Sequence, residues 1–267
     1  MLEQSPPEGS PPVIPEERRR LILAMLGERG SVTVATVERA FGISGMTARR
    51  DLAILAQEGR LRRTHGGAVL PELAGHEDSF RSRLEQEADE KRRIASAIAK
   101  SAEPNETIFI DSSTTSYFAV EQLLELGVSA TLLTNSLPVM SLVASAESSN
   151  LKLIGLGGSF RALTQSFVGA ETVRAIEGFY ADRVVFSVKG ISAEGFLTDP
   201  DALESEVKRA MIMQAATVML VATHRKFDGR GLNVIAPAQR VQVAYLTDPP
   251  ASGARMLADS GVEVIRV

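Results

Sequence analysis

The segment Asp111-Ser112-Ser113-Thr114-Thr115 concentrates polar side chains that could bind a small anion. It follows the apolar run Ile108-Phe109-Ile110 and precedes a helical pattern that begins near Tyr117. A loop between a strand and the N-terminus of a helix attracts anions, because its backbone N–H groups are unpaired and the helix dipole favours negative charge. The segment therefore predicts a phosphate-binding loop. The alternative is a loop whose Ser and Thr only cap the helix.

Further candidate ligands of such an anion stand mostly where strands are expected to end. They are Thr134, Asn135, Gly157, Gly158, Lys189, Gly190 and Lys226, together with Lys208 on a predicted helix. The carboxyl ends of parallel strands meet at one edge of a sheet, which is where such folds bind ligands. Glycines permit close backbone approach, and several lysines at one edge favour a sugar-phosphate pocket. A single lysine is more often a solvated surface charge.

A different stretch has the residues of a DNA-reading helix. A helix is predicted from Ser44, a good N-cap residue, to Glu58, after a turn that contains Gly42. On a helical wheel of about 100° per residue, its core side holds Ala48, Leu52 and Leu55. Its other sides hold Met46, Thr47, Arg49 and Arg50. Recognition helices reach base edges through their first turns, and arginine can donate two hydrogen bonds to guanine. The alternative is a solvated arginine face in a protein-interaction domain.

An arginine-rich hairpin follows this helix. The run Arg60-Leu61-Arg62-Arg63-Thr64-His65-Gly66-Gly67-Ala68-Val69 predicts a strand, a Gly-Gly turn and a second strand. Such a wing places Arg62, Arg63 and His65 on phosphates or in the minor groove. Residues 16–70 carry a net charge of +4 and the remainder −8, as expected when only one end of a chain touches a polyanion. Asp51 is expected to pair with a neighbouring arginine.

Four parts of the chain position these residues. We predict a disordered tail over 1–15, which has five prolines, a winged helix-turn-helix over 16–71, a linker over 72–90 and an effector-sensing α/β domain over 91–267. The helices before Ser44 are expected over 16–26 and 31–41.

The C-terminal part alternates between strand-like and helix-like patterns. Short runs rich in Val, Ile and Leu predict strands over 107–110, 131–134, 151–156, 183–188, 217–222, 241–246 and 262–267. Helical patterns cover 92–100, 117–126, 137–146, 167–177, 204–214 and 254–260. Apolar runs alternating with helices predict an α/β fold with a mostly parallel sheet and helices on both faces.

The composition argues against several classes of protein. The chain has 267 residues and no cysteine, which excludes disulfides, thiolate zinc sites and cysteine nucleophiles. Three histidines spread along the chain make a metal site an unfavourable interpretation, and no cofactor is expected. The longest uncharged run, Leu126–Ala146, is interrupted by Asn135 and Pro138, which argues against a membrane span. The N-terminus lacks the pattern of a signal peptide, so a cytoplasmic protein is expected.

Several motifs together resemble one family. Thr47-Ala48-Arg49-Arg50-Asp51-Leu52 and Arg63-Thr64-His65-Gly66-Gly67-Ala68 are similar to the DNA-binding signature of DeoR-family repressors. The similarity continues through Phe80-Arg81, Lys91, Ile94-Ala95, the segment 111–115, Thr134-Asn135-Ser136, Gly157-Gly158 and Lys226-Phe227. The resemblance implies a winged helix-turn-helix and a sensor domain similar to ribose-5-phosphate isomerase. It also implies repression of a sugar-catabolic operon and release from DNA by a phosphorylated sugar.

Two positions differ from the family pattern. Ser113 stands where the family usually has glycine, and Thr223-His224-Arg225 adds a cation where acidic or Ser residues are common. The added cation favours a more acidic effector.

We therefore expect a DNA-binding transcriptional regulator, a repressor rather than an enzyme, with double-stranded DNA and a phosphorylated small molecule as partners. A homo-oligomer, dimer or tetramer, is also expected, because a reader with one short helix usually needs a partner. One alternative is an activator, or a structural DNA protein without a ligand. The other is a sugar-phosphate isomerase activity retained in the C-terminal domain. That chemistry needs a positioned carboxylate base, for which Asp111 and Asp199 are the candidates.

Overall fold

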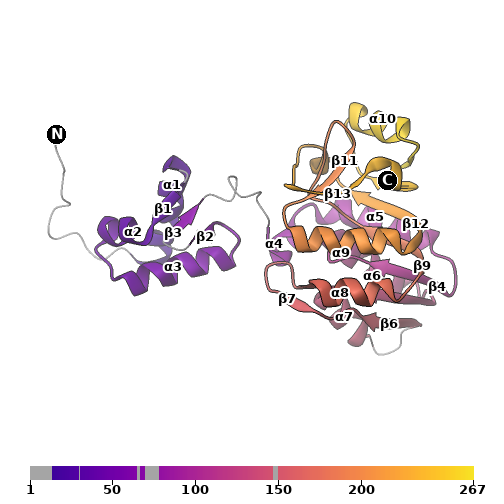
Figure 1. Ribbon diagram of the computed structural model, residues 1–267, viewed down its shortest axis with the longest axis horizontal. Coiled ribbons are helices and arrows are strands. Elements are labelled where there is room, and N and C mark those ends of the chain that lie inside the picture. The colour runs from indigo at the N-terminus through magenta and orange to yellow at the C-terminus, as the bar shows by residue number, and fades with distance from the viewer. Residues whose placement is uncertain (1–13, 30, 65–66, 70–77, 147–149) are drawn as a thin grey trace. The chain divides into compact units, whose positions relative to one another are not determined.

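Buried apolar side chains gather in three clusters, one in the unit Met1–His76 and two in the unit Glu77–Val267. The computed structural model describes residues 14–29, 31–64, 67–69, 78–146 and 150–267 (Figure 1). The predicted tail over 1–15 therefore lies almost wholly outside the described residues, while Pro15 already begins the first helix.

The first unit is a winged helix-turn-helix. Its elements in chain order are α1 (Pro15–Arg29), β1 (Ser31–Thr33), α2 (Val34–Phe41), α3 (Gly45–Gln57), β2 (Arg62–Thr64) and β3 (Gly67–Val69). Gly42 ends α2 in the left-handed conformation with φ of 61°, and Ser44 caps α3 by accepting a hydrogen bond from the Thr47 N–H. The three strands form an antiparallel sheet in the order β1-β3-β2. The predicted turn and N-cap are confirmed.

The beginning of the second helix was predicted wrongly. Ser31–Thr33 was expected to be helical, but it pairs with Gly67–Val69 as a strand. Val32 is buried in this small sheet, and the Thr33 hydroxyl accepts a hydrogen bond from the Thr36 N–H and so begins α2 at residue 34. A three-residue strand whose partner lies more than thirty residues away leaves no local pattern in the sequence.

The second unit is built on a seven-stranded parallel sheet. Its strands are β4 (Glu106–Ile110), β5 (Ala130–Thr134), β6 (Leu151–Gly155), β9 (Ala181–Phe186), β12 (Ala215–Ala222), β14 (Val243–Leu246) and β15 (Glu263–Arg266). They lie in the order β15-β14-β12-β9-β4-β5-β6, and every pair is parallel. Each strand overlaps one of the seven predicted runs, so the α/β fold class is confirmed.

Helices cover both faces of this sheet (Figure 1). One face packs on α5 (Ala88–Ser101), α6 (Thr114–Glu125) and α7 (Leu137–Ala144), and the other on α8 (Ala170–Glu177), α9 (Ala202–Met213) and α10 (Ala251–Asp259). Side chains of β4 alternate between the two faces. Ile108 and Ile110 pack in the cluster with α5, α6 and α7, and Phe109 packs in the cluster with α8, α9 and α10. Burial on both faces explains why the strands are apolar throughout.

Short elements complete the second unit. They are α4 (Phe80–Glu85), the hairpin β7 (Ser159–Arg161) and β8 (Ser166–Val168), the antiparallel sheet of β10 (Gly190–Ile191), β11 (Phe196–Asp199) and β13 (Asn233–Pro237), and the 3-10 helices η2 (His224–Phe227) and η3 (Ala238–Arg240). The helix expected over 167–177 begins only at Ala170, because Ser166–Val168 is a strand and Gly169, with φ of 100°, turns the chain. The segment 72–90, expected as a linker, contains α4 and the start of α5.

The strand order reverses beside β4. From β4 the chain moves outward through β5 and β6, then returns to β9 on the other side and continues to β15. In open α/β sheets such a point, at the carboxyl ends of the strands, is where ligands bind. We therefore expect a ligand to bind at the loops that follow β4 and β9.

Candidate functional site

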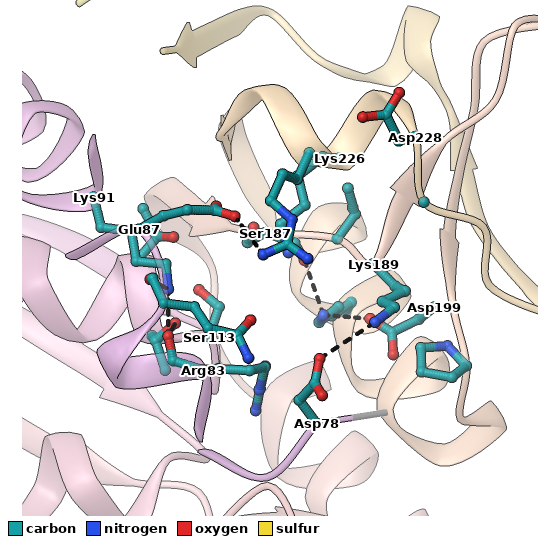
Figure 2. A pocket seen from close by; sticks show the side chains of 18 residues that line it. Asp78, Arg83, Glu87, Lys91, Ser113, Ser187, Lys189, Asp199, Lys226 and Asp228 are labelled. Atoms are coloured by element: carbon teal, nitrogen blue, oxygen red, sulfur yellow. Dashed lines mark hydrogen bonds and ion pairs between the residues drawn. The ribbon is translucent and has the colours of Figure 1, made fainter. Parts of the chain in front are cut away.

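A cavity of about 220 Å³ lies at this reversal of strand order. It is formed by the loops after β4, β9 and β12, by the region of α4 and by the start of α5 (Figure 2). Its lining residues are Asp78, Arg83, Gln86, Glu87, Lys91, Ser113, Thr114, Thr115, Ser187, Val188, Lys189, Asp199, Pro200, Lys208, Arg225, Lys226, Asp228 and Gly229.

Charged side chains dominate the lining, with six cations against four carboxylates. Three of the cations have carboxylate partners: Lys189 lies 3.6 Å from Asp78, Arg225 lies 3.1 Å from Glu87, and Lys208 lies 2.6 Å from Asp199. The other three are Arg83, Lys91 and Lys226, none of which makes an ion pair within the described ranges. The excess of positive charge suits an anionic ligand.

Lys208 is a structural cation at the base of this cavity. Its ammonium donates to the Ser187 carbonyl at 2.8 Å and to the Asp199 carboxylate at 2.6 Å, and it lies 3.6 Å from Asp111. Burial alone would lower the Lys208 pKa, but Asp199, Asp111 and Glu204 outweigh it and raise that pKa above its ordinary value. Lys208 is therefore charged at neutral pH.

Lys226 and Lys91 have the opposite electrostatics. Burial, followed by the charges of Arg83, Lys189 and Lys91, lowers the pKa of Lys226 to about 7. Burial also lowers the pKa of Lys91 to about 8, against the attraction of Glu87. An anion placed among these groups would favour their charged forms.

The hydroxyl loop is held in place by Asp111. One of its oxygens accepts from the Ser113 N–H at 3.0 Å and from the Ser116 hydroxyl at 2.6 Å, and the other accepts from the Ser187 N–H at 3.0 Å. Ser113 has φ of −79° and caps α6, so this position does not require the glycine common in the family. The Asp111 carboxylate therefore holds the loop after β4 and the loop after β9 together.

Glu87 stabilises the part of the cavity wall formed by the start of α5 and the loop after β12. It stands immediately before α5 in the left-handed conformation, with φ of 52°, without capping the helix through its side chain. Its carboxylate accepts from the Thr223 hydroxyl and pairs with Arg225. These contacts join the start of α5 to the loop after β12.

The structure brings together some of the predicted effector residues and separates others. Ser113, Thr114, Thr115, Lys189, Lys208 and Lys226 line the cavity, whereas Asp111, Ser112, Thr134, Asn135, Gly157, Gly158 and Gly190 do not. Thr134 and Asn135 follow β5, and the two glycines follow β6, so these four lie on the side of β4 away from β9. The predicted residues of these strands do lie at the carboxyl edge of the sheet, but the sequence pattern did not predict the strand order, which decides which part of that edge forms the cavity.

The residues outside the cavity have structural contacts. The Asn135 amide donates to the Phe167 carbonyl at 2.9 Å, and the Ser112 hydroxyl donates to buried Glu204 at 3.1 Å. Gly158 has φ of 153°, and a Cβ there would lie 2.1 Å from the Thr172 hydroxyl oxygen. Packing and backbone conformation, rather than ligand approach, account for this glycine.

Several lining residues were missing from the predicted site. Arg83, Gln86, Glu87, Ser187 and Asp228 line the cavity without having been predicted as ligands. Arg83 and Gln86 lie in a segment interpreted as linker, and long-range packing carries them to the sheet edge. Lys91 was noticed only through the family resemblance.

The recognition helix of the first unit exposes the predicted face. Ala48, Asp51, Leu52 and Leu55 are buried, while Met46, Arg49 and Arg50 are exposed. Thr47 is half-buried and its hydroxyl lies 3.0 Å from that of Ser44, so part of its hydrogen-bonding capacity is used in the cap.

The wing and its support are also formed. Arg63 is exposed on β2; Arg62 lies on the same strand, and His65 lies outside the described residues. Asp51 accepts from Arg18 Nε at 2.6 Å and lies 3.5 Å from Arg19, both of α1. The prediction that Asp51 pairs with an arginine is confirmed, and this contact fixes α3 against α1.

These features define a class of protein: a winged helix-turn-helix DNA-binding regulator with a separate α/β sensor unit. Residues 18–73 match the DeoR-like helix-turn-helix domain, and residues 86–248 match the DeoR C terminal sensor domain. The chain belongs to the DeoR family.

Two curated relatives are similar along most of their length. The glycerol-3-phosphate regulon repressor of Escherichia coli (strain K12) is 30% identical over 250 residues, which cover 93% of this chain and 97% of the relative. The HTH-type transcriptional regulator IolR of Bacillus subtilis (strain 168) is 30% identical over 220 residues, covering 82% and 86%. Both relatives carry the names of transcriptional regulators.

Among solved structures, ribose 5-phosphate isomerase A from Methanocaldococcus jannaschii is similar over 52% of this chain and 54% of that chain, with 12% identity and a TM-score of 0.39. No residue role is transferred from it. Within the described part of the chain, no group of three or more His, Asp or Glu side chains could hold a metal ion. No helix of that part is both long and apolar enough to cross a membrane.

Proposed function

We propose that this protein represses a carbohydrate-catabolic operon and leaves its operator when a phosphorylated sugar, or a related small anion, binds the sensor cavity. The observation that supports this most directly is the convergence of six cationic side chains on one cavity at the reversal of strand order. The name of one relative, glycerol-3-phosphate regulon repressor, supports including such a compound among the candidate effectors.

The lining suits a ligand with both phosphate and hydroxyl groups. Arg83, Lys91 and Lys226 offer positive charge without carboxylate partners among the described residues, and Thr115 adds a hydroxyl near the start of α6. The carboxylate of Asp228 can accept hydrogen bonds from sugar hydroxyls. An apolar ligand would leave the buried nitrogens of Arg83 unpaired.

DNA binding is tested on fragments of the protein's own promoter region by fluorescence anisotropy. Arg50→Ala is expected to weaken specific binding by about 1–3 kcal/mol if the side chain contacts a base. Arg63→Ala is expected to weaken specific and random DNA alike and to reduce the salt dependence. Arg255→Ala, an exposed arginine of the second unit, is the matched control. Binding by both first-unit variants that equals the wild type would refute the DNA-binding face.

Effector sensing is tested by adding ribose 5-phosphate, glucosamine 6-phosphate and glycerol 3-phosphate to the protein–DNA complex. Release by at least one compound, with a raised melting temperature of the free protein, is expected. If no phosphorylated compound changes either quantity, the sensor function is wrong while the DNA-binding function stands.

An isomerase activity has weaker support. Both oxygens of Asp111 are occupied by hydrogen bonds, and Asp199 is paired with Lys208, so neither candidate carboxylate is free to act as a base. Conversion of ribose 5-phosphate or glucosamine 6-phosphate by the purified protein would contradict the assignment as a regulator without enzyme activity.

The proposal includes a homo-oligomer acting in the cytoplasm. One short recognition helix buries little surface, and a symmetric pair of helices on adjacent half-sites supplies the missing affinity. Sedimentation of the free protein and of its operator complex measures this directly.

A further inference from the structure

The guanidinium of Arg83 is an incomplete hydrogen-bonding group in the wall of the cavity. Its Nε and one Nη atom, Nη2, are buried and have no hydrogen-bond partner among the described residues. Burying a charged donor without an acceptor is costly, so such groups normally meet a partner. Arg83 lines the same cavity as Lys91 and Lys226 (Figure 2).

The backbone of α4, by contrast, is well tethered to the sensor unit. The Arg83 carbonyl accepts from the Lys91 ammonium and, at 3.4 Å, from the Thr114 hydroxyl. Phe80 is buried, its N–H donates to the Leu163 carbonyl at 2.8 Å, and its ring meets that of Tyr117 edge-on at 5.8 Å. Arg83 is thus held at the cavity by its main chain while its side chain lacks acceptors.

The missing partner has a definite chemistry. Neighbouring Lys226 and Lys91 are cations or potential cations, and the charge of Arg83 contributes to the low pKa of both. An acceptor that satisfies Arg83 must therefore also relieve repulsion among these three groups. A guanidinium presents parallel N–H donors that match two oxygens of a phosphate, which makes a phosphate group the best fit.

We propose that Arg83 binds the phosphate group of the effector, so that α4, the first helix of the sensor unit, is itself part of the effector site and changes its order with occupancy. This inference rests on the proposed function, and it names the residue and the helix through which that function is regulated. The unit begins at Glu77 and α4 at Phe80, so α4 is the sensor helix closest along the chain to the DNA-binding unit.

The coupling follows from where the contacts are made. The contacts that hold α4 are the Phe80 ring on Tyr117, the Phe80 N–H on the Leu163 carbonyl, and the Lys91 and Thr114 donors on the Arg83 carbonyl, and none of them uses the Arg83 guanidinium. The six residues of α4 cannot be stable as a helix alone. A phosphate bridging Arg83 and Lys226 would add charge-assisted bonds between α4 and the loop after β12. Effector binding is therefore linked to protection of the α4 backbone.

The experiment uses the full-length protein with inorganic phosphate and ribose 5-phosphate as probes. Binding is measured by calorimetry, and amide hydrogen exchange is followed by mass spectrometry in peptides that cover α4. The variants are Arg83→Ala, Arg83→Lys and the control Arg81→Ala, an exposed arginine of the same helix. Arg83→Lys keeps the positive charge but loses the parallel pair of N–H donors. It replaces Arg83→Ala as the test variant if Arg83→Ala does not fold.

Wild type and Arg81→Ala are expected to bind ribose 5-phosphate, and their amide hydrogens in α4 are expected to exchange more slowly when it is bound. Arg83→Ala is expected to bind about 10- to 100-fold more weakly, to lose that protection and to stay on DNA when effector is added. Arg83→Lys is expected to lie between them. Equal affinity of Arg83→Ala and wild type would overturn this inference and leave the proposed function intact. Tight binding without any change in α4 exchange would overturn its coupling role. Absence of binding of both probes by the wild type would overturn this inference and count against the sensor function, while the DNA-binding function would stand.

Discussion

Effector affinity is expected to depend steeply on pH because two lysines of the cavity lose their charge near neutrality. The pKa is about 7 for Lys226 and about 8 for Lys91 in the free protein. A bound phosphate stabilises the charged ammonium, so both pKa values rise on binding and the complex holds more protons than the free protein. Affinity is therefore highest at low pH and falls as the pH rises through these values.

The magnitude follows from the number of protons taken up. Each proton linked to binding weakens the affinity by up to tenfold per pH unit, since one pKa unit is about 1.4 kcal/mol. Between pH 6.5 and 8.5 Lys226 alone accounts for a loss of about 10- to 30-fold, and Lys91 for a further few-fold above pH 8. The second pKa of a phosphate monoester is about 6, so the ligand itself remains largely dianionic across this range.

Calorimetry with ribose 5-phosphate measures both the affinity and the number of protons taken up on binding. Titrations at each pH in buffers of different ionisation enthalpy give the number of protons bound, which should approach one near pH 7.5 and exceed it near pH 8.5. Lys226→Met is expected to bind more weakly at pH 6.5 and to lose most of the pH dependence below pH 8. Lys152→Met, at an exposed position on β6, is the control. Affinity that is constant from pH 6.5 to 8.5 with no proton uptake would refute the reasoning.

Three further predictions concern stability and are checked by urea unfolding. Asp51→Asn removes the negative charge that pairs with the buried Arg18 guanidinium and is expected to destabilise the first unit by about 3 kcal/mol, whereas full retention of stability would show that the charge of the pair contributes nothing. Lys208→Met leaves two buried carboxylates without their cation and is expected to destabilise the sensor unit by about 3–5 kcal/mol, and unchanged stability would contradict this. Gly190→Ala would place a Cβ 2.0 Å from the Gly229 carbonyl oxygen and is expected to cost about 1–3 kcal/mol and to weaken ribose 5-phosphate binding, an effect that unchanged affinity would exclude.

The large sheet was predictable because each of its strands has its own apolar run in the sequence. A strand buried on both faces must be apolar along its whole length, and the seven runs satisfy that condition with boundaries close to those observed. The sheet of β10, β11 and β13 was not predictable in the same way. Phe196 pairs with Pro237, forty residues further along the chain, and no short pattern records such a pairing.

The candidate site was predicted in part for the same reason. Ser113 and Lys226 follow predicted strands directly, so their position at the carboxyl edge needed only the local pattern. Asn135 follows a strand equally well, yet its strand lies on the far side of β4, and strand order is a property of tertiary packing. Arg83 is the converse case: no strand precedes it, and the docking of α4 brings it to the cavity.

The charges of the cavity are not balanced by its own side chains, and this supports the proposal that one site is both stable and responsive to an anion. Lys208 is neutralised by buried carboxylates and stays charged, so it supports the fold whether or not ligand is present. Lys226 and Lys91 face Arg83 without carboxylate partners among the described residues, and their low pKa values limit the repulsion by allowing them to lose protons. An anion reverses that balance, because it recharges the lysines and supplies acceptors to Arg83 at the same time. We therefore expect the anionic group of the proposed effector to contribute most of the binding free energy, and the sugar to select among anions.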